Sequence, residues 1–287
     1  YEMTNSDWSS DVCSSDLNWD GKIHYITKTG QFKIGLLPKV YDMCIEMGIK
    51  PKVVDMRQPL PKVSKVVTNI GKYKLRPEQE KAVKAVINNK IGNTPFHIGV
   101  LDYTVNAGKT LIMSSLYLSY KKQLKTLLIT NDSDWLNQAR EEFKQYLPGE
   151  DITFVQGKVL NWSNFTIGMV QSISRNMRFY QKELSQIDMV LVDEADQGGS
   201  KQYQNVITRL FNTRIRIGLS GTIYMSKLAK DKVKNMNLEC FFGKVIAEFK
   251  LKDSIKKGYS TKTVVKMVAG KPWYGNWESE EVSYKEV

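Results

Sequence analysis

The stretch Thr104-Val105-Asn106-Ala107-Gly108-Lys109-Thr110 lies between an apolar run at 97–101 and an apolar stretch of helical period at 111–118. A strand, a turn containing Gly-Lys-Thr and a helix are the surroundings that a phosphate-binding loop requires. Gly108 would let the backbone approach a phosphate, and successive N–H groups and the positive end of the helix would face that anion. Lys109 would reach the β- and γ-phosphates of a nucleotide, and the Thr110 hydroxyl would hold Mg²⁺. The strict pattern has glycine at position 103, where this sequence has tyrosine, so a plain turn remains the alternative.

An acidic pair follows a second apolar strand. Residues 187–192 are mostly apolar and partly β-branched, and Asp193-Glu194-Ala195-Asp196 comes directly after them. Asp193 would hold Mg²⁺ opposite the phosphate-binding loop, and Glu194 would orient and deprotonate the attacking water. The alternative is an acidic turn on the surface. A third strand at 215–219 ends in Ser220-Gly221-Thr222.

In this order, Ala-Gly-Lys-Thr, Asp-Glu-Ala-Asp and Ser-Gly-Thr resemble motifs I, II and III of superfamily 2 helicases, over residues 75–268. The resemblance implies an α/β fold, a RecA-like P-loop NTPase domain with a parallel sheet flanked by helices. It also implies hydrolysis of ATP with Mg²⁺ and movement on nucleic acid. Lys109, Asp193 and Glu194 would be catalytic, and Thr110 and Asp193 would bind the metal. The nucleotide would contact Thr104, Asn106, Ala107, Gly108, Lys109 and Thr110.

The family resemblance assigns four further residues to the nucleotide site. Gln79 follows Leu75-Arg76-Pro77-Glu78 at the start of an expected helix, where the family uses glutamine to read the adenine edge. An amide suits this task because it both donates and accepts, although an exposed helical glutamine is the alternative. Gln197, where many relatives have histidine, would sense the γ-phosphate. Ser220 and Thr222 would couple the nucleotide site to a second motor domain.

Two strand ends resemble the nucleic-acid contacts of the family. The strand 126–130 precedes an expected helix at 135–146, which Asp132 or Ser133 could cap. This region resembles motif Ia, whose backbone and small hydroxyls contact phosphates. The strand 165–170 resembles another strand that ends against the bound nucleic acid. The candidate phosphate contacts are therefore Ser133, Gln171, Ser172 and Arg175. An ordinary strand-end turn is the alternative for the last three.

Composition excludes several classes of protein. The 287 residues are 41% hydrophobic and 25% charged, as in ordinary globular proteins, and no run of 18 apolar residues predicts a membrane span. The chain has three cysteines, Cys13, Cys44 and Cys240, and two histidines. Three widely spaced cysteines favour reduced thiols over a disulfide framework or a zinc site, and so predict a cytoplasmic protein, located in the host cytoplasm if a phage encodes it. Two histidines make a histidine-based metal site or a Ser-His-Asp triad an unfavoured interpretation.

The formal charge of +12 is unevenly distributed, because residues 50–90 and 244–271 are rich in lysine and arginine. Such a balance favours a polyanionic partner, and we expect nucleic acid. A solvated surface that only maintains solubility is the alternative.

The chain divides into four predicted parts. Residues 1–17 contain a near-repeat of Ser-Ser-Asp and are expected to be a non-native or disordered tail. Residues 18–70 predict a small α+β module that grips nucleic acid or merely packs against the motor, a layout similar to phage DNA helicases of the UvsW type. Residues 71–268 form the RecA-like motor, and 269–287 begin a truncated following region. The expected elements outside the motor core are strands at 22–26, 31–34 and 52–55, a helix at 36–47, a helix at 228–233, and strands at 244–247 and 263–268.

We expect the first motor domain of an ATP-dependent DNA helicase or translocase. A second RecA-like domain with an arginine finger would lie in a longer protein, so the chain alone should bind ATP weakly and hydrolyse it slowly. DNA is favoured over RNA because motif Ia is Thr130-Asn131-Asp132-Ser133 and motif III is Ser-Gly-Thr. DEAD-box RNA helicases have Pro-Thr-Arg-Glu-Leu and Ser-Ala-Thr there. The alternatives are a DEAD-box-like RNA helicase, a P-loop ATPase of a packaging or restriction motor, and a non-catalytic nucleic-acid-binding fragment.

Overall fold

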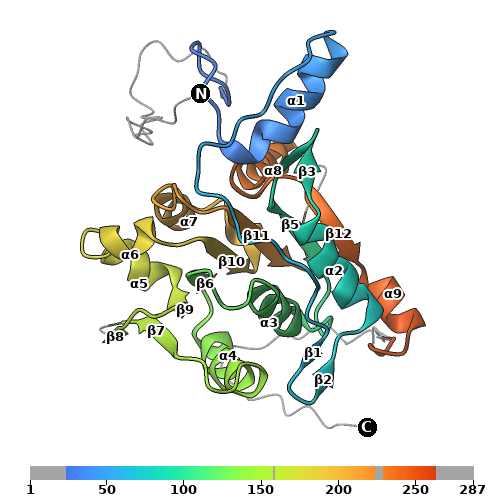
Figure 1. Cartoon of the computed structure of the whole chain (residues 1–287), viewed down its shortest axis with the longest axis vertical. Coiled ribbons are helices and arrows are strands. Elements are labelled where there is room, and N and C mark those ends of the chain that lie inside the picture. Colours follow the sequence, from blue (N-terminus) through green and yellow to red (C-terminus); the bar gives the residue numbers. More distant parts are fainter. Residues whose placement is uncertain (1–23, 158, 224–228, 263–287) are drawn as a thin grey trace, which may run out of the picture.

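A sheet of seven parallel strands and one antiparallel strand forms the centre of the molecule (Figure 1). The computed structural model describes residues 24–157, 159–223 and 229–262. The strand order is β12-β5-β11-β10-β6-β9-β7-β8, and β8 is the antiparallel strand. The strands are β5 (Ile98–Tyr103), β6 (Thr126–Thr130), β7 (Ile152–Gln156), β8 (Val159–Leu160), β9 (Phe165–Met169), β10 (Met189–Asp193), β11 (Ile215–Ser220) and β12 (Val245–Phe249).

Helices cover both faces of this sheet, which explains why its strands read as nearly continuous apolar runs. Every residue of β5, β6, β10 and β11 is buried. Alternate residues enter two cores, so Leu128 packs beneath one set of helices and Leu127 beneath the other. The first set is α2 (Pro77–Ile87), α3 (Lys109–Ser119) and α4 (Ser133–Tyr146); the second is α5 (Val170–Arg175), α6 (Gln181–Ser185), α7 (Lys201–Ile207) and α8 (Ala229–Phe242).

The sheet places the predicted functional segments together. In a parallel sheet the carboxyl ends of the strands share one edge, where ligands of open α/β folds bind. β5, β10 and β11 are adjacent in the order β5-β11-β10, and each ends in one of the three motifs. The predicted α/β fold with a parallel sheet flanked by helices is confirmed.

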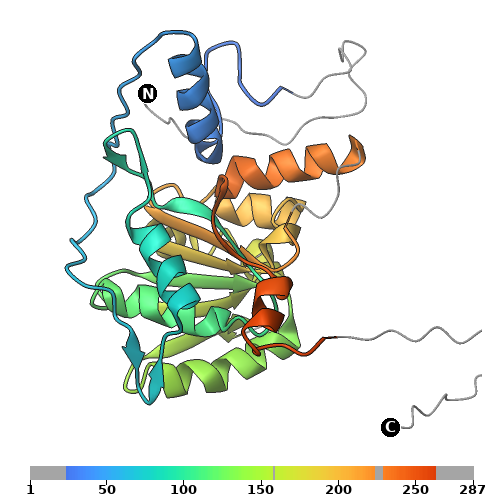
Figure 2. The ribbon, with the colours of Figure 1, turned by 90° about the vertical axis from the view of Figure 1, so that its right-hand side faces the viewer.

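The segment before the motor packs its first turn onto α8 (Figure 2). There η1 (Ile34–Leu36) and α1 (Leu37–Glu46) follow one another, and Lys39 forms an ion pair with Glu239 at 2.6 Å. A Cβ on Gly35 would lie 2.1 Å from the Glu239 carbonyl oxygen, so only glycine fits this approach. Beyond this contact α1 extends away from the sheet, and Met43 and Met47 on it are exposed.

Residues 51–66, which we name the strap, connect α1 to the motor. Asp55 binds Arg57 at 2.8 Å and Arg214 at 3.3 Å, next to the amino end of β11. Directly after the strap, the Val67 N–H donates to Ser119 Oγ and its carbonyl accepts from Ser115 Oγ, both on α3. The hairpin of β1 (Asn69–Ile70) and β2 (Tyr73–Lys74) follows. A second hairpin pairs β3 (Lys90–Ile91) with β4 (Thr94–Pro95), and α9 (Leu251–Lys256) follows β12.

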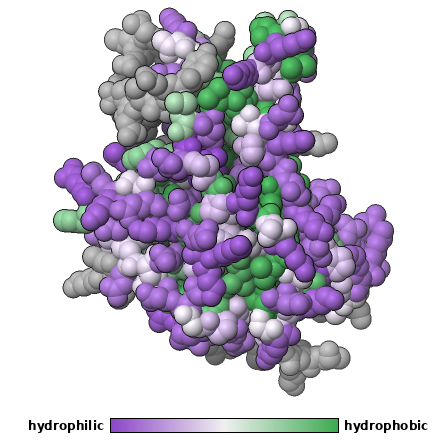
Figure 3. Space-filling view, viewed as in Figure 1, coloured by the Kyte–Doolittle hydropathy of each residue, from purple (hydrophilic) through white to green (hydrophobic). Residues whose placement is uncertain are grey.

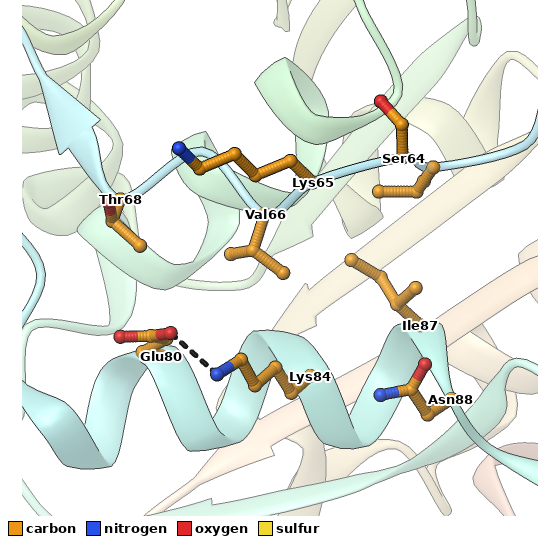
Figure 4. A pocket seen from close by; sticks show the side chains of 9 residues that line it. Ser64, Lys65, Val66, Thr68, Glu80, Lys84, Ile87 and Asn88 are labelled. Atoms are coloured by element: carbon orange, nitrogen blue, oxygen red, sulfur yellow. Dashed lines mark ion pairs between the residues drawn. The ribbon is translucent and has the colours of Figure 1, made fainter.

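A pocket of about 490 Å³ lies between the strap and α2 (Figure 4). Lys65 approaches it from the strap, while Glu80, Lys84 and Asn88 line it from α2. Glu80 and Lys84 form an ion pair at 2.7 Å, which partly neutralises the lysine charge.

None of the three strands predicted before the motor is formed in the described residues. Between 24 and 34 the only pairing in the described chain is a bridge from Ile26 to Phe32, because an isolated two-stranded ribbon is marginal in water. Residues 52–55 form no strand and belong to the strap on the surface, where Val54 is 61% exposed and Asp55 is held by its ion pairs.

The two predicted helices outside the motor core and the strand predicted at 244–247 are confirmed. The helix expected at 36–47 is α1, and the one expected at 228–233 is the start of the longer α8. The strand at 244–247 is β12, while the strand predicted at 263–268 lies outside the described residues. None of the described helices is long and apolar enough to span a membrane.

Candidate nucleotide site and nucleic-acid interface

The loop between β5 and α3 has the backbone that a phosphate-binding loop needs. Gly108 caps α3 with φ 75° and ψ 48°, a left-handed conformation that glycine adopts without steric cost. Asn106 also has a positive φ of 63°, and the Ala107 N–H donates to the Thr104 carbonyl at 3.2 Å. The loop therefore turns directly into the amino end of an 11-residue helix, where free N–H groups and the helix dipole favour an anion.

Lys109, the first residue of α3, binds the two carboxylates at the end of β10. Its Nζ lies 2.7 Å from Glu194 Oε1 and 3.2 Å from Asp193 Oδ1. Burial lowers the pKa of Lys109, but Asp193 and Glu194 outweigh burial, so its pKa is raised overall. Lysine is thus held charged between two acids in a site largely withdrawn from water.

Asp193 is 2% exposed, and burial raises its pKa despite the opposing effect of the Lys109 ammonium. The neighbouring charge of Glu194 raises it further. Its Oδ1 atom faces the Lys109 ammonium at 3.2 Å and has no further hydrogen-bond partner within the described chain. A buried acceptor of this kind is costly unless a donor or a cation satisfies it.

Glu194 is held in a left-handed conformation, with φ 49° and ψ 53°. For a residue with a side chain this backbone costs about 1–2 kcal/mol, so the surrounding fold must impose it. Its second oxygen accepts a hydrogen bond from Ser220 Oγ at 3.2 Å, and Ser220 also lies 3.2 Å from Asp196 Oδ1 and from Thr222 Oγ1. The ends of β10 and β11 are therefore joined through side chains that the sequence singles out.

The Ser-Gly-Thr motif also meets the phosphate-binding loop through backbone contact. A Cβ on Gly221 would lie 2.9 Å from Thr104 Cα, so the end of β11 passes directly against the start of the phosphate-binding loop. Thr104 and Thr110 are buried, whereas Thr222 is exposed. The structure thus brings together the predicted catalytic residues, the loop and the predicted coupling residues.

Gln79 lies against the loop, but both ends of its amide already have protein partners. Its Nε2 donates to the Ala107 carbonyl at 2.8 Å, and its Oε1 accepts from the Arg76 N–H at 2.8 Å. The side chain is 1% exposed and connects the start of α2 to the loop. An adenine contact would have to use its second N–H and its remaining lone pair.

Arg76 is a loop contact that the sequence interpretation missed. Its guanidinium donates to the Asn106 carbonyl at 3.1 Å and lies 4.3 Å from the centre of the Tyr259 ring. The sequence did contain a signal for Arg76, because this residue lies in the same motif as Gln79. No local signal points to Tyr259, since it comes from the turn after α9.

The predicted nucleic-acid contacts lie at the carboxyl ends of the neighbouring strands β6 and β9. Ser133 begins α4 and is exposed, while Asp132 is the cap: its carboxylate accepts from the Asp134 N–H at 2.8 Å. Arg175 is exposed at the end of α5. Ser172 is buried, and its hydroxyl accepts from the Gly157 N–H at 2.9 Å, so it stabilises a neighbouring loop.

Asn131 links the acidic motif to the predicted nucleic-acid contacts, and it was not among the predicted site residues. Its amide donates to Gln197 Oε1, and its carbonyl accepts from Gln171 Nε2 at 3.4 Å. The signal was its position, a polar residue directly after a buried strand. Gln197 therefore connects the acidic motif to the end of β6.

The donor set suits Mg-ATP. A threonine hydroxyl, a buried carboxylate and the oxygens of a nucleotide are the ligands that Mg²⁺ prefers. Thr110 and Asp193 would supply the protein ligands, and the buried Oδ1 of Asp193, whose partner here is the Lys109 ammonium, would accept such a cation.

The chain is similar to a curated DNA helicase. The curated ATP-dependent DNA helicase uvsW of Enterobacteria phage T4 is 22% identical over 228 residues, which are 72% of this chain and 43% of the relative. The chain therefore spans less than half the length of this relative.

Solved structures share the fold. The crystal structure of the UvsW helicase from bacteriophage T4 matches with a TM-score of 0.62 and 22% identity, covering 81% of this chain and 84% of that one. A nuclease-deletion mutant of the Type ISP restriction-modification enzyme LlaGI, in complex with a DNA substrate mimic, matches with a TM-score of 0.50 and 15% identity, covering 64% and 18%.

The model of the family described as Type III restriction enzyme, res subunit, matches residues 72–225. This range contains the phosphate-binding loop, the acidic motif and the Ser-Gly-Thr motif, and it is more than half of the 287 residues. The chain therefore belongs to the family of the Type III restriction enzyme res subunit, and it has a RecA-like fold similar to that of the solved UvsW helicase.

Proposed function

We propose that this chain is the first motor domain of an ATP-dependent DNA helicase or translocase. The observation that carries the proposal is the contact of Lys109 with both Asp193 and Glu194. This lysine starts a helix after a glycine-containing loop and contacts two carboxylates at the end of another strand of the sheet. Phosphoryl transfer from ATP to water uses this arrangement of charges.

Each residue has a distinct task in this proposal. Lys109 would exchange its carboxylate partners for the β- and γ-phosphate oxygens, which releases Glu194 to accept a proton from the attacking water. Thr110 and Asp193 would hold Mg²⁺, which neutralises charge on the phosphates when it is bound. Ser220 would keep the Glu194 carboxylate oriented through its hydrogen bond.

The nucleotide site can communicate with the nucleic-acid contacts through Gln197, Asn131 and Gln171. Glu194 begins the turn that contains Gln197, and Gln197 bonds with Asn131 at the end of β6. Asn131 in turn accepts from Gln171. A change in the position of Glu194 would therefore shift the exposed contacts Ser133 and Arg175. Contacts to phosphates predict little sequence preference and a steep dependence on salt.

DNA is the favoured substrate because the curated relative is named an ATP-dependent DNA helicase. A second candidate is the motor subunit of a restriction enzyme, which the description of the matching family favours. A nuclease domain in the same polypeptide or in a tightly bound subunit would distinguish this second candidate.

The direct test is ATP hydrolysis by the 287-residue chain without nucleic acid, with single-stranded DNA and with RNA. We expect slow hydrolysis that DNA stimulates more than RNA, and that Glu194→Gln abolishes. Stimulation by RNA alone would replace the proposal with an RNA helicase. Hydrolysis that Glu194→Gln leaves unchanged would exclude this site as its source.

A further inference from the structure

Phe179, in the turn between α5 and α6, is the most exposed of the ten phenylalanines. It is 79% exposed, and the next is Phe211 at 46%, while six of the other eight are buried and two are partly buried. Burying a phenylalanine contributes about 1.5–3 kcal/mol, so an exposed ring forgoes that stabilisation. A single exposed apolar residue can be incidental, and its surroundings decide whether it has a role.

The turn that carries Phe179 is firmly held. Tyr180, the next residue, is 4% exposed and packs edge-on against Trp162, with ring centres 5.1 Å apart. The Phe179 N–H donates to the Asn176 carbonyl at 2.9 Å, and the Asn176 amide donates to the Ser172 carbonyl at 2.8 Å. The ring is therefore presented to solvent by a fixed backbone, which reduces the entropy that a partner must remove on binding.

Positively charged residues flank Phe179 in the sequence. Arg175, Arg178 and Lys182 are exposed and lie within four residues of it, and none forms an ion pair with another residue of the described chain. The surface around α5 and α6 is predominantly hydrophilic (Figure 3). A protein-binding patch would instead gather several apolar side chains around its anchor.

The turn also lies on the side of the proposed nucleic-acid contacts. α5 starts at the carboxyl end of β9, beside the end of β6 where α4 begins. Arg175, one of the predicted phosphate contacts, is four residues before Phe179. An exposed aromatic ring among cations near a phosphate-binding edge matches the chemistry of single strands, whose bases stack on rings while their phosphates contact the cations.

We propose that Phe179 is a stacking platform for an unpaired base of a single-stranded nucleic acid, whose backbone phosphates contact Arg175 and Arg178. This inference rests on the proposed function, and it adds the requirement that the bound segment be unpaired at this position. A fully paired duplex keeps its bases stacked on each other and would gain only the phosphate contacts.

The test is the affinity of the 287-residue chain for a fluorescein-labelled 15-nucleotide oligo(dT) and for a 15-base-pair duplex, measured by anisotropy at low salt. Phe179→Ala should weaken single-strand binding roughly 5- to 150-fold, equivalent to about 1–3 kcal/mol, and should leave duplex binding within about twofold. Phe179→Trp should retain the single-strand affinity. Phe211→Ala, which removes the other exposed phenylalanine before β11, is the matched control and should change neither affinity.

A second readout isolates stacking. A 2-aminopurine base in the oligonucleotide should lose fluorescence on binding to the wild type and to Phe179→Trp, and keep it with Phe179→Ala. Thermal unfolding of all variants verifies that the exposed substitutions leave the fold intact. Equal single-strand affinities of wild type and Phe179→Ala would overturn the stacking platform while leaving the motor proposal standing. A wild type that binds neither DNA would overturn both.

Discussion

Lys109 Nζ lies 2.7 Å from Glu194 Oε1 across the end of an intervening strand, although the residues are 85 positions apart. β11 lies between their two strands, and Ser220 at its end donates to the other Glu194 oxygen. The ion pair and this hydrogen bond therefore tie together three strand ends at the edge where a nucleotide would bind.

The pair of Lys109 and Asp193 predicts a stability defect that depends on pH. Lys109→Met leaves the buried Asp193 without its cation, which should cost about 3 kcal/mol at pH 8. Burial already raises the pKa of Asp193, and loss of the ammonium raises it further. A carboxyl whose pKa is raised on folding stabilises the fold at low pH and loses this effect as pH rises through the folded value. Urea unfolding at pH 5 and pH 8 should therefore show the larger deficit at pH 8.

The double variant Lys109→Met/Asp193→Asn is the control for that prediction. It removes the buried carboxylate together with its partner, so the pH dependence of the deficit should disappear. If Lys109→Met lowers the free energy of unfolding equally at pH 5 and pH 8, the ionised Asp193 carboxylate is not the cause of the destabilisation.

Gly108 should be far less tolerant of alanine than Gly149, although both have a left-handed backbone with φ of 75° and 80°. Either substitution incurs strain of about 1 kcal/mol. At Gly108 the new Cβ would also lie 2.3 Å from Gln79 Nε2, whereas at Gly149 nothing lies within 4 Å. We expect Gly149→Ala to bind ATP like the wild type and Gly108→Ala to bind it at least tenfold more weakly, in a calorimetric titration. Equal affinities would mean that the loop can move away from Gln79.

The strap should detach when Asp55 is removed. Burial raises the pKa of Asp55, but its bonds with Arg57 and the charge of Arg214 outweigh burial and lower it overall. A carboxyl with a lowered pKa stabilises the fold above its unfolded value and loses this effect as pH falls through the folded one. Asp55→Ala should cost about 1–2 kcal/mol at pH 7 and accelerate tryptic cleavage within the strap several-fold. Asp42→Asn, an exposed change on α1, should do neither, and equal cleavage of both variants would exclude the anchoring role.

The two described cysteines should differ in reactivity. Cys240 is 4% exposed in α8, and burial raises the pKa of its thiol to about 11, while Cys44 on α1 is half-buried. Because the thiolate is the nucleophile, iodoacetamide at pH 8 should modify Cys44 well before Cys240 in a Cys13→Ser background. Mass spectrometry of tryptic peptides gives both rates, and faster modification of Cys240 would show that η1 does not stay packed on α8.

Local sequence patterns predicted much of the sheet because its strands are apolar and short. The strand at 126–130 is β6 without any shift, and those ending at Asp193 and Ser220 are β10 and β11. Strand, turn and helix around Gly108 follow from residues close together in the chain. Parallel topology then places the ends of these strands side by side, so the proximity of Lys109 and Glu194 could also be expected.

The contacts that could not be predicted depend on packing between distant segments. Gln79 was interpreted through its family role, whereas the fold uses both ends of its amide to join α2 to the loop. The strand predicted at 52–55 is absent because this segment is held on the surface by the ion pairs of Asp55 with Arg57 and Arg214, which no local pattern shows. Tyr259 reaches Arg76 only because β12 and α9 pack next to α2.

Isothermal titration of the chain with ATP and Mg²⁺ measures whether Lys109, Thr110 and Asp193 bind Mg-ATP. We expect a single saturable site that Lys109→Met weakens at least tenfold and that Glu194→Gln preserves, since Glu194 acts on water and not on the nucleotide. Wild-type protein that binds no ATP, or Lys109→Met that binds it as tightly as the wild type, would exclude a nucleotide site at these residues.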